Sequence, residues 1–251
     1  MSARDDLHEL VRTTALVLGR GMVVAVLASL SYAALFGALL GFALLVNTVV
    51  SPDVGALMML PTVVAAFFAV GGVVASFLAA FTASLEGPPR FGIVMKRALL
   101  GGPAVVGVAM LAVVPLGLTA AGIALVVAPL RHPNEASVLT TLVGLAVALV
   151  GAWMFGRYVL LTAVEYFRDA GDGIVVVSRL DQQVPGHEAV VLVTGAAPVL
   201  GILAVIGHAF RPTVSVPSTM EPVVVLAASS VILILTLAVA TAAYAVIDAP
   251  R

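Results

Sequence analysis

Six apolar stretches, each long enough to cross a lipid bilayer, dominate this sequence. A bilayer core of about 30 Å requires roughly 20 apolar residues in a helix. None of the stretches alternates apolar and polar residues as a barrel strand does, so the helix is the form that satisfies their backbone hydrogen bonds in lipid. We predict an all-α, polytopic membrane protein whose single transmembrane domain has helices at about 21–50, 54–85, 99–130, 138–164, 189–210 and 221–247.

The composition excludes most other classes of protein. Of the 251 residues, 62% are hydrophobic and 10% are charged, whereas a soluble domain usually carries about 25% charged residues. A net charge of −1 argues against a nucleic-acid partner. The absence of cysteine excludes disulfides, thiolate metal sites and cysteine nucleophiles. Eleven arginines against one lysine, with abundant alanine and valine, are typical of a GC-rich prokaryotic genome.

The basic residues predict the orientation of the chain in the cell membrane. Ten arginines and lysines fall in segments on one side of the six predicted helices, and only Arg131 and Arg211 fall on the other. Segments rich in arginine and lysine remain in the cytoplasm. We therefore expect both termini in the cytoplasm and three helical hairpins that each cross outward and return.

Two cytoplasmic segments are predicted to lie along the membrane surface. Residues 1–20 carry six charged residues, so we expect an interfacial helix here and not a signal peptide. Its apolar stripe comprises Leu7, Leu10, Val11, Thr14 and Leu18. The second segment, 86–98, forms a cytoplasmic elbow with basic residues near lipid phosphates: Arg90, Lys96 and Arg97. Such elbows either anchor a bundle at the interface or couple it to a cytoplasmic partner.

Small residues at four-residue spacing indicate where the helices pack. Lipid is as apolar as leucine, so association in a membrane relies on close approach at small side chains. These faces are Ser29, Ala33, Gly37 and Gly41; Gly71, Ala75, Ala79 and Ala83; and Gly144, Ala148, Ala152 and Gly156. They explain packing within the bundle, or alternatively a homo-oligomer interface. Pro115 predicts a kink in the third helix, since its ring removes a helix hydrogen bond.

The few charged residues near the predicted spans are the candidate binding groups. With α-helical spacing, Arg157 and Glu165 share one face, and Arg168 follows one turn later. This polar cluster is a candidate site for an anionic lipid headgroup or a substrate carboxylate. The alternative is that Arg157 extends to the headgroups beside Trp153 and Tyr158.

No catalytic, cofactor or metal site is predicted. The common hydrolase, metalloprotease and phosphate-loop motifs are missing from the sequence. His8, His132 and His187 lie in different segments, without the spacing of metal ligands. We therefore expect a protein that is not an enzyme and has no cofactor.

The segments after the second and fourth predicted helices resemble a known group of proteins. Residues 82–90 lead into Lys96-Arg97-Ala98-Leu99, and residues 164–169 precede Val177-Ser178-Arg179-Leu180. They resemble the cytoplasmic elbows of archaeal and bacterial six-helix membrane proteins similar to the membrane domain of glycerophosphoryl diester phosphodiesterases. The resemblance covers about 80–190 and departs before the fifth helix, where Asp181, Gln182 and Gln183 replace a basic run. Because these segments hold no catalytic residues, the resemblance implies a fold and no activity.

These observations favour a non-catalytic helical bundle, with a structural, regulatory or lipid-associated role. The alternative is a transporter or permease subunit that works with an ion gradient or with a separate ATPase. Membrane lipids are the expected partners, together with a second copy of the chain or an ATPase subunit.

Overall fold

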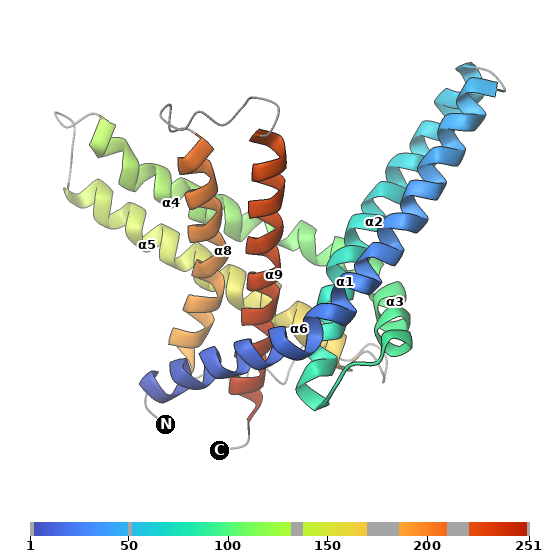
Figure 1. Ribbon diagram of the computed structural model, residues 1–251. Coiled ribbons are helices and arrows are strands. Elements are labelled where there is room, and N and C mark those ends of the chain that lie inside the picture. Colours follow the sequence, from blue (N-terminus) through green and yellow to red (C-terminus); the bar gives the residue numbers. More distant parts are fainter. Residues whose placement is uncertain (1–2, 50–51, 132–137, 170–185, 210–220, 250–251) are drawn as a thin grey trace. The chain divides into compact units, whose positions relative to one another are not determined.

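The computed structural model describes residues 3–49, 52–131, 138–169, 186–209 and 221–249 (Figure 1). These residues are almost entirely helical and include no strand, which confirms the all-α prediction. In chain order the elements are α1 (Ala3–Val49), α2 (Pro52–Glu86), α3 (Phe91–Leu111), α4 (Val113–Arg131), α5 (Val138–Met154), the π-helix η2 (Phe155–Leu161), α6 (Thr162–Asp169), α8 (Glu188–Ala209) and α9 (Glu221–Asp248).

Four stretches of the described residues are helices long and apolar enough to cross a membrane. They are Asp5–Val46, Phe91–Val127, Val138–Arg168 and Val224–Asp248. Two shorter apolar helical stretches, Gly71–Glu86 and Glu188–Gly201, overlap the other two predicted spans, 54–85 and 189–210. The membrane character of the chain is thus supported by four helices in the part that the structure describes.

The N-terminal segment and the first predicted span form one helix. α1 contains 47 residues without the expected boundary near residue 20. No proline interrupts it, so the helical hydrogen bonds continue through the change from charged to apolar sequence. At 1.5 Å per residue α1 is about 70 Å long, which exceeds a bilayer core of about 30 Å.

The predicted elbow is the start of α3. The Arg90 carbonyl accepts hydrogen bonds from the backbone N–H groups of Ile93 and Val94, each at 3.1 Å. α3 then ends at Leu111, and α4 begins at Val113. The ring of Pro115 clashes with the carbonyl four residues earlier, which belongs to Leu111. The expected disturbance by Pro115 is therefore present as a break between two helices.

The chain divides into two compact units, which are described separately. The first comprises Met1–Thr14, Leu111–Thr162 and Val176–Arg251, and the second comprises Ala15–Met110 and Ala163–Val175. One boundary falls beside the break at Pro115, and another directly follows η2.

In the first unit, glycines bring α4 and α5 close together. Gly122 of α4 faces Gly144 and Ala148 of α5, while Gly151 of α5 faces Thr119 and Pro115 of α4. Residue numbers rise along one helix as they fall along the other, so the pair is antiparallel. Figure 1 shows the two helices side by side.

α8 packs against α5, η2 and α9 in the same unit. Gly195 lies against the backbone of Ala152 and Gly156, and Gly201 lies against the side chain of Ile232. The predicted face on 144–156 therefore packs inside the unit, with Ala152 only 4% exposed.

The second unit packs in a similar way. Gly71 of α2 meets the Gly102 carbonyl of α3, and the ring of Tyr32 on α1 covers Gly72. Phe167 of α6 is 1% exposed and its ring lies against Gly101. The predicted face on α2 is largely buried, whereas Gly37 and Gly41 on α1 are exposed, so the prediction of packing within the bundle is wrong for that part of α1 and the alternative of a homo-oligomer interface stays a prediction.

Replacement of Gly195 by alanine tests the close approach of α8. A methyl group there would meet the carbonyl oxygen of Ala152, which is backbone and cannot move aside. We expect Gly195→Ala to lower the free energy of unfolding in detergent by about 1–3 kcal/mol. Gly117→Ala is the matched control, because a Cβ at Gly117 has no contact within 4 Å. Equal stability of the two variants would contradict the packing.

Candidate functional site

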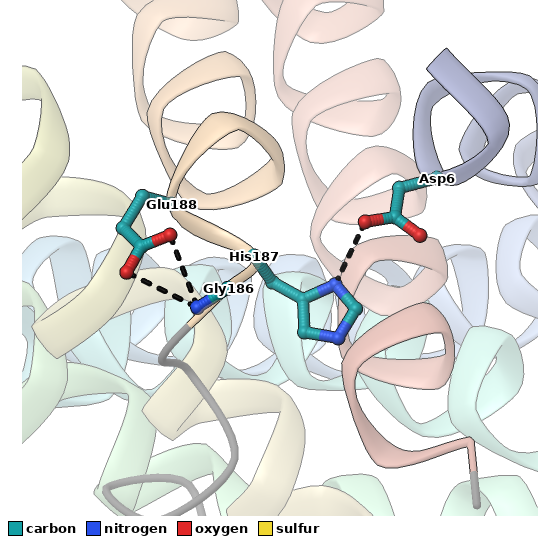
Figure 2. Close-up of polar contacts among 4 residues, drawn as sticks. All are labelled: Asp6, Gly186, His187 and Glu188. Carbon is teal, nitrogen blue, oxygen red and sulfur yellow. Dashed lines mark hydrogen bonds and ion pairs between the residues drawn. The ribbon is translucent and has the colours of Figure 1, made fainter. Parts of the chain in front are cut away.

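A buried acid–histidine pair joins the first turns of α1 to the start of α8. The Oδ2 atom of Asp6 lies 3.1 Å from Nδ1 of His187, and the two side chains are 5% and 6% exposed. Figure 2 shows the carboxylate and the imidazole directed toward one another. Both residues belong to the first unit, so the pair fixes the N-terminal turns within that unit.

Local backbone geometry holds His187 in place. Gly186 has a φ of +98°, a conformation that glycine adopts without strain. The carbonyl of His187 accepts hydrogen bonds from Val190 N–H at 3.0 Å and Val191 N–H at 3.1 Å. Both carboxylate oxygens of Glu188 accept the Gly186 N–H at 3.1 Å (Figure 2). These bonds satisfy backbone N–H donors at the start of α8 and orient His187, which lies between Gly186 and Glu188.

The hydrogen bonds at the start of α8 also change the pKa of Glu188. The backbone N–H groups of Glu188 and Gly186 lower the pKa of its carboxyl group, and His187 adds a smaller effect in the same direction. Because the pKa of Glu188 is lower in the folded protein than in the unfolded one, the hydrogen bonds to its carboxylate contribute to stability. That contribution is complete above the unfolded pKa. It is lost as the pH falls through the folded pKa.

The chemistry of the pair is that of a buried polar contact. Asp6 Oδ1 is also buried and accepts no hydrogen bond from the residues that the structure describes. Across these residues, no group of three histidine, aspartate, glutamate or cysteine side chains could hold a metal ion. Removing either partner would leave the other in a site that excludes water.

Sequence reasoning did not find this pair. Asp6 and His187 are 181 residues apart in the chain, and no local spacing connects them. The available signal was that Asp6 lies one helical turn before Leu10 and so shares its face of the helix. The structure buries that face, with Leu10 only 4% exposed. The predicted stripe also included Val11, which the structure leaves 69% exposed.

Arg157 of η2 lies beside two aromatic rings, those of Trp153 in α5 and Tyr158 in η2. Its guanidinium carbon is 5.7 Å from the centroid of the Trp153 ring and 5.5 Å from that of Tyr158. The two rings stand at 87° to one another with centroids 5.9 Å apart. Both distances fall within the range of cation–π attraction. The predicted proximity of Arg157 to these aromatic residues is thus present.

The structure places the other two residues of the predicted cluster in the second unit. Glu165 is 3% exposed and Arg168 is half-buried, both on α6. The π-helix before them forms i→i+5 hydrogen bonds, so the α-helical spacing used to group Arg157 with Glu165 does not apply. A joint site of these three residues stays a prediction.

The basic residues of the elbow surround a buried apolar face. Arg90 and Lys96 are exposed and Arg97 is half-buried, while Val94 and Ala98 are fully buried. The start of α3 therefore packs Val94 and Ala98 inside the unit and leaves its basic side chains outside; a location of this elbow at the membrane surface stays a prediction. Of the second elbow, at 165–188 after the fourth predicted helix, residues 170–185 lie outside the described residues, and with them residues 177–183 of the resemblance.

Comparisons with protein-family models, curated proteins and solved structures found no match to this chain. The resemblance to six-helix prokaryotic membrane proteins therefore stays a prediction.

Paired substitutions test the contact between Asp6 and His187. We expect His187→Ala to reduce the free energy of unfolding by about 3–5 kcal/mol, because it leaves a buried carboxylate without this partner. Replacing both residues by leucine should recover most of that loss. Denaturant titration in detergent provides the measurement.

Arg12→Ala is the matched control on the same helix. It breaks the exposed contact between Arg12 and Glu9, whose side chains are 75% and 43% exposed. Its effect should stay below about 1 kcal/mol. A loss in His187→Ala no larger than in this control would contradict a stabilising role for the pair.

Proposed function

We propose that this chain is a multi-pass protein of a prokaryotic cell membrane, with six transmembrane helices in three hairpins. The observation that carries this proposal is the apolar surface of its helices. Large apolar side chains are exposed along α1, α3, α5 and α9, among them Val23, Leu30, Phe42, Leu100, Met110, Leu142, Val150, Leu226 and Leu235. Water disfavours so many exposed apolar side chains, whereas acyl chains accommodate them.

The lengths of α2 and α8 support the two additional spans. α2 has 35 residues and α8 has 22, and both are largely apolar. A helix of about 20 residues suffices to cross a bilayer. With six spans, the arginine and lysine bias places both termini in the cytoplasm.

Within the membrane, we propose a non-catalytic bundle with a structural or regulatory role that depends on lipid contact. Two polar features support it. Arg90, Lys96 and Arg97 cluster where α3 begins, and Arg157 lies between aromatic rings. Basic residues beside apolar helices attract anionic headgroups. The proposed fold relatives are the six-helix prokaryotic membrane proteins that the elbows resemble.

A transporter or permease subunit is the second candidate. It is favoured by the two interruptions of apolar helices, the break before Pro115 and the π-helix that holds Arg157. Interrupted helices are frequent in transporters, where they line substrate pathways. Such a subunit would use an ion gradient or an ATPase bound at the cytoplasmic elbows.

Affinity purification from native membranes in mild detergent distinguishes the two candidates. Mass spectrometry of the bound material should find phospholipids and no stoichiometric ATPase, and proteoliposomes should show no protein-dependent substrate flux.

A stoichiometric ATPase, or flux that depends on Arg157, would contradict the non-catalytic bundle and favour the permease. The elbow variant Arg90→Gln/Lys96→Gln/Arg97→Gln is the control for docking. It should release an ATPase that binds at this elbow and leave one that binds elsewhere.

A further inference from the structure

The backbone of η2 is fixed on one side by α8. A Cβ atom at Gly156 would meet the carbonyl oxygen of Val191 and would lie 3.0 Å from the backbone nitrogen of Gly195. No side chain longer than hydrogen fits between these two backbones. The π-helix is therefore held against α8 immediately before Arg157.

The opposite side of this segment is open. Phe155, Val159 and Leu160 are buried, whereas Tyr158 is 50% exposed and Trp153 is half-buried. Arg157 lies against both aromatic rings and is half-buried, with its Nη1 atom buried. In the proposed membrane-spanning orientation, the exposed edge of this segment, at Tyr158, faces lipid.

The depth of Arg157 follows from helix length. From Val138, where α5 begins, to Arg157 the chain rises about 29 Å at 1.5 Å per residue. A bilayer core is about 30 Å thick. With α5 beginning at the outer boundary of the core, Arg157 comes near the inner boundary, and its side chain extends toward the lipid phosphates along the two helical turns that remain of the predicted span, which ends at 164.

The chemistry at this depth selects an anion. A guanidinium presents its N–H donors in one plane, in a fork that matches two phosphate oxygens. The Trp153 and Tyr158 rings contact the guanidinium by cation–π attraction and have the amphipathic character of residues at the headgroup boundary. We propose that Trp153, Arg157 and Tyr158 bind the phosphate group of an anionic lipid in the cytoplasmic leaflet. The site rests on the proposed membrane function.

Fluorescence of Trp153 tests this site directly, because it is the chain's single tryptophan. The full chain is reconstituted in phosphatidylcholine vesicles that contain a small fraction of acyl-brominated lipid, either phosphatidylglycerol or phosphatidylcholine. Bromine quenches tryptophan at close range. We expect quenching to indicate about fivefold enrichment of phosphatidylglycerol over phosphatidylcholine at Trp153.

Variants assign this preference to the guanidinium. Arg157→Gln should abolish the preference while quenching by brominated phosphatidylcholine persists. Arg157→Lys should retain part of it, because the charge remains without the planar fork. Arg12→Gln makes the same change in net charge at an exposed site and should leave the preference intact.

The possible outcomes distinguish failure of the lipid site from failure of the proposed membrane insertion. Equal quenching by both brominated lipids, or a preference unchanged in Arg157→Gln, would overturn the lipid site alone. Absence of quenching by either lipid would overturn the proposed membrane insertion of this segment. Displacement of phosphatidylglycerol by millimolar inorganic phosphate would overturn the lipid assignment and identify free phosphate as the ligand.

Discussion

Satisfaction of backbone hydrogen bonds in an apolar medium is the constraint on which this structure depends. Lipid offers no donors or acceptors, so each apolar segment must form these bonds within itself. The described helices do so, and several buried serine and threonine hydroxyl groups follow the same rule. Ser76, Thr194 and Thr241 are buried, and each donates to the carbonyl four residues earlier at 2.8 Å. These three side chains thus enter the bundle with their hydroxyl groups satisfied, whereas the buried hydroxyl of Tyr32 has no partner among the described residues.

Because lipid provides little hydrophobic drive for helix association, contact geometry decides which helices pair. Glycine supplies that geometry where Gly122 meets Gly144 and where Gly195 meets Ala152. Proline has the opposite effect: Pro115 separates α3 from α4, and this break lies beside a boundary between the two compact units. The π-helix η2 lies beside another boundary. A few residues therefore determine both which helices pack together and where the helices are interrupted.

The features that the sequence could predict are those set by covalent chemistry or by composition. Long apolar runs require helices in lipid. The ring of Pro115 predicted a disturbance of its helix, but Pro61, Pro103 and Pro198 lie inside continuous helices, so the sequence does not show which proline breaks a helix. Small residues at four-residue spacing could not show whether a face meets a helix or lipid, as exposed Gly37 and Gly41 illustrate. The Asp6–His187 contact and the π-helical turn at Arg157 depend on tertiary packing between distant segments, which leaves no local spacing to recognise.

The number of spans is the central claim, and single-cysteine labelling tests it most directly because the chain has no cysteine of its own. A membrane-impermeant maleimide is applied to intact cells that express Ser51→Cys, Ser137→Cys, Ser178→Cys or Ser218→Cys. Six spans predict labelling of the first, second and fourth variants, and of Ser178→Cys only after the membrane is permeabilised. Protection of position 51 or 218 in intact cells, with labelling after permeabilisation, would contradict the six-span topology.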